Sequence, residues 1–271
     1  TIFMGTLDIE NQMEDIYAMQ MRGASVIFAE DHETGYHSMH AAMKAAHLHA
    51  EVKIDGFLIF NGPIGAHPQP TIHRFFQSLL GDETKEQCGR IIGAMPDAIV
   101  VPVGMGSGAV GLFTPFKCMD SPEVKLLGVQ PVGAAPLFAG SLGYLWSSRS
   151  YLLRGESGKI LAARSHAEDL RCPTVGPEVG WWKSEGKAQF VEARDKDAEE
   201  GMDLVRRPRA LRAQLGDGIC SQECYEAGGR DGSRKECRAA CVWQVPSGYR
   251  WYLIGWVRSR LSNSHCLGVR I

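Results

Sequence analysis

Three glycines and a serine stand where an apolar segment gives way to a helical one, in the stretch GMGSGA at residues 104–109. The preceding residues 97–103, DAIVVPV, have the apolar character of a central parallel strand. A strand, a glycine-rich turn and a helix place several backbone N–H groups at a helix N-terminus, where they and the helix dipole bind phosphate. Glycine permits positive φ and close backbone approach, and the Ser107 hydroxyl adds a donor. The stretch therefore predicts a phosphate-binding turn.

The glycine spacing alone leaves the role of this turn open. It departs from GxGxxG because the third glycine falls early, and it lacks the Lys-Ser/Thr pair of a nucleoside-triphosphate loop. Glycines at a tight strand-to-helix turn also occur for purely structural reasons. Phosphate binding and a structural role both remain consistent with the spacing.

Four cysteines form the second group that carries chemistry, spaced as Cys220-x3-Cys224-x12-Cys237-x3-Cys241. Cysteines at i and i+4 share a helix face, so two such pairs facing each other across a turn offer four thiolates for tetrahedral Zn²⁺. Two disulfides in a helical hairpin are the oxidised alternative, and this spacing resembles the twin-CX3C pattern of small mitochondrial import chaperones. The third alternative is a tail that does not fold, which the lack of apolar periodicity favours.

The segments that position the glycine turn alternate between helical and extended patterns. Helical spacing or alanine-rich composition predicts helices at 10–21, 38–50, 70–80 and 81–92. Short apolar runs predict strands at 24–28, 56–62, 97–103 and 123–131. Strands that alternate with helices indicate an α/β fold with a parallel sheet flanked by helices.

Composition restricts the class of protein. The chain has 271 residues, 44% hydrophobic residues and a formal net charge of −2, so it has material for a core and no overall charge that favours nucleic acid. No apolar run reaches the ~18 residues of a membrane span. No signal peptide is recognisable, and Thr1 indicates a start that is cut. Scattered cysteines at 88, 118, 172 and 266 suit a reducing compartment, so we expect a cytoplasmic location, or a plastid one in a photosynthetic eukaryote.

A change in composition near Arg206 predicts a boundary. Residues 1–205 carry 17 basic and 26 acidic residues, whereas residues 206–271 carry 11 Arg, one Lys and five acidic residues. Three of the six Trp lie after this boundary. A basic tail rich in Arg and Trp suits contact with RNA, but no RNA-binding motif accompanies it, and no nucleic-acid partner is expected.

Several motifs, in order along the chain, resemble the tryptophan synthase β chain family. FMGTLDIENQ and YAMQMRGASVI are similar to the start of its middle section, and GPIGAHPQPTIHRFFQ, GDETKEQ, GMGSGAVGLF, LLGVQPVG and CPTVGPEVGWWKSEGKAQFV follow in the family's order. The resemblance covers residues 1–205. It implies a two-domain α/β lyase that holds pyridoxal phosphate (PLP) between its domains. The family joins indole to L-serine and usually works with an α subunit.

This resemblance also implies a domain organisation. Residues 1–60 are expected to be the remainder of the mobile N-terminal domain, and residues 61–205 a C-terminal-type domain that contains the glycine turn. Residues 206–271 are expected to be a divergent basic tail, with disorder among the alternatives.

The glycine turn corresponds to the family's phosphate-binding motif. The matching residues are Gly104, Met105, Gly106, Ser107, Gly108 and Ala109. Met105 stands where the family has Gly, so a long side chain crowds the turn, and Gly108 stands where the family has Asn, so a polar side chain is lost. The backbone donors remain, and the resemblance therefore implies weak, non-covalent binding of PLP.

Other positions depart from the family's functional residues. Arg171 stands where the family has its catalytic Asp, and Cys172 where it has an aromatic residue beside indole. Gln130 stands where the family has Glu. The Thr-Leu-Lys-Asp segment near the α-subunit contact reads Gly-Tyr-His-Ser at 35–38, which weakens the expected pairing with an α subunit.

The lysine that attaches PLP in this family lies in a His-Lys pair, upstream of the region where this chain starts, as does the acid/base Glu. No His-Lys pair occurs in residues 1–271. Without that amine no Schiff base orients and activates PLP, so we expect no catalytic residue in this chain. The sequence predicts a truncated or degenerate tryptophan synthase β-like protein, a pseudoenzyme. The alternatives are a scaffold that pairs with a tryptophan synthase α subunit or a β chain, and an active enzyme completed by a further N-terminal segment.

Overall fold

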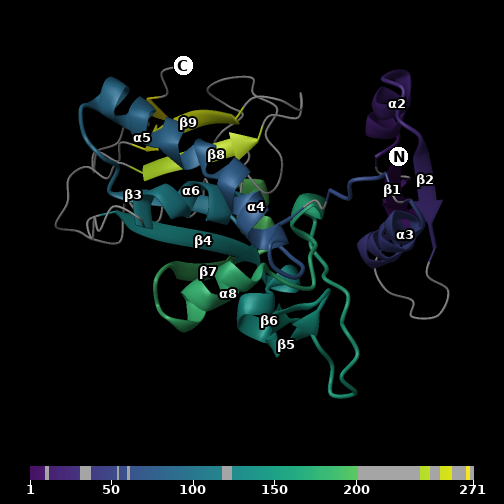
Figure 1. Ribbon diagram of the computed structural model, residues 1–271. Helices are drawn as coiled ribbons and strands as arrows, with labels where there is room; N and C mark the ends of the chain where they lie inside the picture. Colours follow the sequence, from purple (N-terminus) through teal and green to yellow (C-terminus); the bar gives the residue numbers. More distant parts are fainter. Residues whose placement is uncertain are drawn as a thin grey trace. The chain divides into compact units, whose positions relative to one another are not determined.

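The computed structural model describes residues 1–9, 12–30, 38–53, 55–59, 62–117, 124–200, 239–244, 251–257 and 267–268. The chain divides into two compact units (Figure 1). The first unit contains residues 1–61 and 160–162, and the second contains residues 62–159 and 163–271.

The first unit is a parallel strand pair with helices. Its elements are β1 (Ile2–Gly5), α1 (Thr6–Ile9), α2 (Met13–Met21), β2 (Val26–Ala29) and α3 (Ser38–Val52). Ile2 lies opposite Val26 across the pair. Two alanines of α3, Ala41 and Ala42, pack against Ala29 of β2. Their small side chains allow the helix to lie close to the strands.

The second unit is built on a six-stranded sheet, in the order β10-β9-β8-β3-β4-β7 (Figure 1). Four neighbouring strands, β8, β3, β4 and β7, run parallel, and β9 and β10 are antiparallel to their neighbours. The elements of this unit are α4 (Gln69–Gln77), α5 (Leu79–Ile92), β3 (Ala98–Pro102), α6 (Ser107–Lys117), β4 (Lys125–Pro131), η1 (Val132–Ala134), α7 (Pro136–Ala139), β5 (Ser141–Leu145), β6 (Ser148–Leu152), η2 (Glu168–Leu170), α8 (Pro177–Ser184), β7 (Gln189–Ala193), β8 (Ala239–Gln244), β9 (Trp251–Val257) and β10 (Leu267–Gly268).

The core of the second unit lies between β3 and the helices. Ile99, Val101 and Val103, at alternate positions, belong to one buried cluster with Phe113 of α6 and Trp182 of α8. The rings of Phe113 and Trp182 are 5.9 Å apart between centroids. Alternate strand residues face one side of a sheet, so this cluster covers one face of β3. The other face is covered as well, because Val100 is fully buried, and this explains the uninterrupted apolar run in the sequence.

The predicted α/β fold with a parallel sheet flanked by helices is confirmed, and the strands predicted at 97–103 and 123–131 correspond to β3 and β4. The strand predicted at 56–62 is wrong for residues 56–59, which have no regular structure. Phe57 and Ile59 are 83% and 81% exposed. An apolar run becomes a strand only where a neighbouring strand supplies its hydrogen bonds, and the described part of the chain pairs no strand with this segment.

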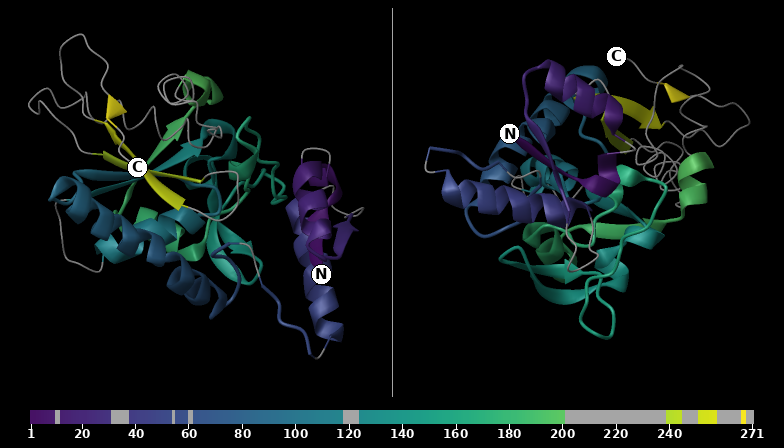
Figure 2. Two further views of the ribbon diagram at one scale, coloured as in Figure 1. Left: turned by 90° about the horizontal axis from the view of Figure 1, so that it is seen from above. Right: turned by 90° about the vertical axis from the view of Figure 1, so that its right-hand side faces the viewer.

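The tail supplies strands that the sequence pattern does not predict. β8 pairs in parallel with β3, with Ala98 opposite Ala239 and Val100 opposite Cys241. β9 pairs antiparallel with β8, and both strands lie beside the rest of the sheet (Figure 2). Residues 239–244 and 251–257 therefore extend the sheet that carries the glycine turn.

Candidate functional site

The glycine turn, residues 104–109, lies between β3 and α6. β3 ends at Pro102 and the 11-residue helix α6 begins at Ser107, so the turn occupies the carboxyl end of a parallel strand and a helix N-terminus. Gly106 has a φ of +102°, a conformation that L side chains rarely adopt. A Cβ at Gly106 would also lie 2.6 Å from Cγ2 of Val179 in α8. Backbone conformation and space both require glycine at this position.

Gly104 and Gly108 bring neighbouring segments close to the turn. A Cβ on Gly104 would lie 3.1 Å from the carbonyl oxygen of Asp169, and a Cβ on Gly108 would lie 3.1 Å from Cγ2 of Val101. Gly104 thus allows the chain at Asp169 to lie against the turn, and Gly108 allows α6 to lie close to β3.

The turn presents backbone N–H donors. At this end of α6 the Val110 N–H donates to the Gly106 carbonyl over 2.9 Å, and the first N–H groups of an α-helix have no acceptor within the helix. In residues 62–117 and 124–200, no backbone carbonyl outside α6 accepts from the N–H of Met105, Gly106 or Ser107. These donors and the helix dipole fit an oxyanion, and the phosphate of PLP is of that class.

Met105 is held by two contacts in the structure. A Cβ on Gly62 would lie 2.9 Å from Sδ and Cε of Met105, so the thioether lies along the Gly62 backbone. The Met105 carbonyl accepts a hydrogen bond of 2.8 Å from the N–H of Gly176, the residue that caps the N-terminus of α8. Met105 therefore links the turn to α8 through its backbone and to Gly62 through its side chain.

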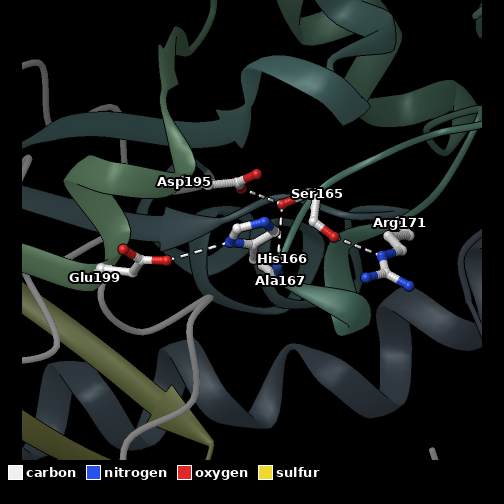
Figure 3. Close-up of polar contacts among 6 residues, drawn as sticks. All are labelled: Ser165, His166, Ala167, Arg171, Asp195 and Glu199. Carbon is white, nitrogen blue, oxygen red and sulfur yellow. Dashed lines mark hydrogen bonds and ion pairs between the residues drawn. The ribbon is translucent and has the colours of Figure 1, made fainter.

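The segment that carries Arg171 lies against the turn through Asp169. The exposed Arg171 donates from Nε to the carbonyl oxygen of Ser165 over 2.6 Å (Figure 3). A guanidinium is a permanent cation that donates only, whereas the carboxylate of the family's Asp accepts only. The structure thus shows the substituted side chain in use as a donor within its own loop.

Ser165 ties this loop to the residues after β7. Its Oγ donates to Oδ1 of Asp195 over 2.6 Å and accepts from the N–H of Ala167 over 3.0 Å (Figure 3). His166 Nδ1 and Glu199 Oε1 are 3.2 Å apart on the exposed side of the same junction. This group of side chains fixes the loop, and the buried Ser165 is its centre.

Gln130 is fully buried at the end of β4. Its Nε2 donates to the Val103 carbonyl over 3.2 Å, and its Oε1 accepts from the Leu137 N–H over 3.1 Å. An amide can make both bonds, whereas a carboxylate cannot donate to the carbonyl. Gln130 therefore connects the end of β3 to α7.

Two thiols in this unit are buried and free. Desolvation raises the pKa of Cys172 from 9.0 to about 12, against a small lowering by the Thr174 backbone, and burial raises the pKa of Cys88 to about 11. Thiolates are the reactive form of cysteine, so neither side chain is suited to nucleophilic chemistry near neutral pH. Cys172 fills apolar space where the family has an aromatic residue.

Of the four clustered cysteines, the structure describes Cys241 alone. Cys241 lies in β8, so the helical pairing predicted for it is wrong, because β8 satisfies its backbone by pairing with β3 and β9. Cys220, Cys224 and Cys237 lie outside the described residues. The zinc and disulfide alternatives therefore stay predictions.

The glycine turn is recognisable in the sequence, whereas the contacts that surround it are not. The contact of Gly106 with Val179, the bond from Gly176 to Met105 and the bond from Ser165 to Asp195 join residues far apart in the chain. The φ of +102° at Gly106 does have a local signal, since glycine is the residue that tolerates it.

Backbone N–H donors on a glycine turn, at the carboxyl end of a parallel strand, are typical of phosphate-binding α/β proteins. The chain belongs to the family described as "Pyridoxal-phosphate dependent enzyme", whose model matches residues 7–213. None of the described helices is both long and apolar enough to cross a membrane.

Two curated relatives are tryptophan synthases. The chain is 36% identical over 217 residues to the tryptophan synthase beta chain of Vesicomyosocius okutanii, covering 76% of this chain and 53% of that protein. It is 36% identical over 215 residues to the tryptophan synthase of Saccharomyces cerevisiae, covering 76% of this chain and 30% of that protein. The chain is thus similar to part of these tryptophan synthases. It spans 53% of the bacterial relative and 30% of the yeast relative.

A solved structure supports the fold. The diaminopropionate ammonia lyase of Escherichia coli superposes with a TM-score of 0.59 at 20% identity, covering 82% of this chain and 53% of that chain. At this identity the likeness extends to the fold alone.

Proposed function

We propose that this chain binds PLP non-covalently at Gly104–Ala109 and does not, by itself, join indole to L-serine. The observation that carries the binding proposal is the set of N–H donors at the start of α6, beside a glycine whose φ is +102°. When bound, PLP supplies an electron sink for amino-acid chemistry, and the chain's own contribution is to hold its phosphate. Met105 leaves these donors in place while its thioether packs on Gly62.

Arg171 supports the absence of catalysis by the chain alone. A fixed cation at the position of the family's catalytic Asp cannot accept a proton and reverses the local charge. Its Nε is also occupied by the Ser165 carbonyl. Residues 1–271 contain no His-Lys pair, so the lysine motif that attaches PLP in the family has no counterpart among them.

Equilibrium dialysis with PLP tests the proposal. We expect saturable PLP binding that inorganic phosphate displaces, no specific lysine labelled after borohydride reduction, and no tryptophan from indole and serine. A single labelled lysine together with tryptophan formation would show instead an active enzyme. Absence of phosphate-competitive binding would contradict the role of the glycine turn.

A second candidate function is a scaffold that pairs with a β chain, a second copy of this chain included. Four apolar side chains at helical spacing are exposed where α4 meets α5: Ile72 (38%), Phe75 (73%), Phe76 (70%) and Leu79 (60%). Contiguous exposed apolar surface is typical of protein–protein contacts. Light scattering should show a dimer that the Phe75→Ser/Phe76→Ser variant loses. A monomer at all concentrations excludes the self-pairing, and co-purification with an α subunit instead of a β chain indicates a different partner.

We also propose a reducing compartment, cytoplasm or plastid, for this protein. The free, buried thiols of Cys88 and Cys172 support it, because such thiols persist where disulfides do not form.

A further inference from the structure

Two lysines share one tryptophan at the far end of α6 and α8 from the glycine turn. Nζ of Lys187 lies 4.1 Å from the ring centroid of Trp181, and Nζ of Lys117 lies 5.9 Å from the same centroid. Lys117 is also 5.4 Å from the ring of the buried Trp182. Trp181 itself is 48% exposed, so this cluster of Lys117, Lys187 and Trp181 is open to solvent.

Regular structure fixes the backbone positions of Lys117 and Lys187. After α8 the Lys187 N–H donates to the Trp182 carbonyl over 2.8 Å, and the Gly186 N–H donates to the Lys183 carbonyl over 3.3 Å. With Gly186 at a φ of +63°, these two bonds form a Schellman motif that turns the chain back toward Trp181. Lys117 is held by the last turn of α6, whose Phe116 is buried in the core.

The cluster has an excess of positive charge. The pKa of Lys117 is lowered by desolvation and by the nearby Lys187, although Glu178 acts in the opposite direction. Glu178 already accepts from Arg74 over 3.1 Å. Within residues 62–117 and 124–200, no carboxylate forms an ion pair with Lys117 or Lys187. In the described part of the chain, the two ammonium groups thus contact the same ring, and neither forms an ion pair.

We propose that Lys117 and Lys187 bind a phosphate group beside Trp181, at a site separate from the glycine turn. A dianion there offsets the repulsion between the two ammonium groups and accepts hydrogen bonds from both. Lysine serves phosphate recognition as a point charge, and two lysines on different elements define a position between them. Free phosphate and phosphate esters share the chemistry that this site recognises.

Tryptophan fluorescence during titration with inorganic phosphate tests this site, because the anion binds next to an indole ring. We expect a saturable change in emission that sodium chloride of equal ionic strength does not produce. Lys117→Met/Lys187→Met should weaken the affinity about tenfold or more, since two charge-assisted contacts are lost. The matched control, Lys125→Met/Lys159→Met, removes the same charge from exposed lysines elsewhere and should bind as the wild type. Repeating the titration with a phosphate monoester separates the two sources of the group.

Two further variants distinguish this site from the glycine turn. Trp181→Phe should lose the fluorescence change while phosphate binding, followed by calorimetry, continues. Gly106→Ala should weaken PLP binding at the glycine turn and keep the fluorescence change. A change that persists in Lys117→Met/Lys187→Met and disappears in Gly106→Ala would place the phosphate at the glycine turn and overturn the lysine site. Equal affinity in the lysine variant and in its matched control would overturn it as well.

Discussion

Gly106 is restricted by its backbone and by its surroundings. Its φ of +102° disfavours any Cβ, and a Cβ would in addition meet Val179 at 2.6 Å. We expect Gly106→Ala to lower the free energy of unfolding by about 1–3 kcal/mol and to weaken PLP binding, because the turn must shift. Urea unfolding and equilibrium dialysis measure the two effects.

A second substitution separates the two restrictions at Gly106. Val179→Ala removes the contact but leaves the φ, so Gly106→Ala/Val179→Ala should recover stability only in part. Wild-type PLP affinity in Gly106→Ala would mean that the glycine turn does not hold the phosphate.

The buried thiol of Cys172 makes stability depend on alkaline pH. Its pKa is 9.0 when solvated and about 12 in the fold, where desolvation disfavours the thiolate. Because the folded state binds the proton more tightly, this stabilisation is complete below pH 9.0 and is lost as the pH rises towards about 12. Over that interval the free energy of unfolding should fall by about 1.4 kcal/mol per pH unit from this thiol. Urea unfolding at pH 8, 9 and 10 should show that the free energy of unfolding falls less steeply with pH in Cys172→Ala than in the wild type. Equal slopes for the two proteins would contradict the raised pKa of Cys172.

At the scale of elements, Ser165 joins the loop before α8 to the helical residues after β7. It is 5% exposed and bonds both to Asp195 and to the N–H of Ala167, which is itself 1% exposed. Ser165→Ala leaves that buried N–H without its acceptor, so it should lower the free energy of unfolding by about 1–3 kcal/mol. Ser78→Ala, which removes an exposed hydroxyl bonded to the Phe75 carbonyl, should change it by less than about 0.5 kcal/mol. Equal losses of unfolding free energy in the two variants, measured by urea titration, would show that the Ser165 hydrogen bonds add no more stability than an exposed hydroxyl does.

The sequence predicts those helices and strands whose formation depends on residues adjacent in the chain. β3 and α6 follow from an apolar run that ends in glycines, because both the burial and the turn conformation depend on adjacent residues. Residues 56–59 and β8 show the opposite case, since a strand depends on a partner distant in the chain. The apolar segment 56–59 has no pairing strand in the described part of the chain, and β8 obtains one from β3.

The same distinction applies to the candidate site. Gly104–Ala109 was predictable as a set of backbone donors, and the substitution at Arg171 was visible in the sequence. The hydrogen bond from Arg171 to Ser165 and the close approach of Val179 to Gly106 depend on tertiary contacts. The charge and type of each side chain in the site could therefore be predicted from the sequence, whereas its orientation required the structure.

At the scale of the whole molecule, the tail completes the sheet that carries the glycine turn. β8 lies between β3 and β9, and its partner residues Ile99 and Val100 are fully buried. Removal of the tail exposes the backbone edge of β3, and an unpaired apolar edge promotes aggregation. We therefore expect a chain of residues 1–200 to be less stable than the full chain and to associate in light scattering.

A point substitution tests the same pairing without truncation. Ala240 lies opposite Ile99 of β3 and Trp256 of β9, so its N–H lies between two paired strands, and Ala240→Pro removes that donor. This variant should lose about 3 kcal/mol or more of unfolding free energy, whereas the control Ala240→Gly, which keeps the N–H, should lose about 1 kcal/mol. If residues 206–271 are instead a non-folding tail, neither substitution changes the unfolding midpoint and residues 1–200 remain monomeric. That result would mean that the tail is not part of the sheet and that β3 is an edge strand of the sheet.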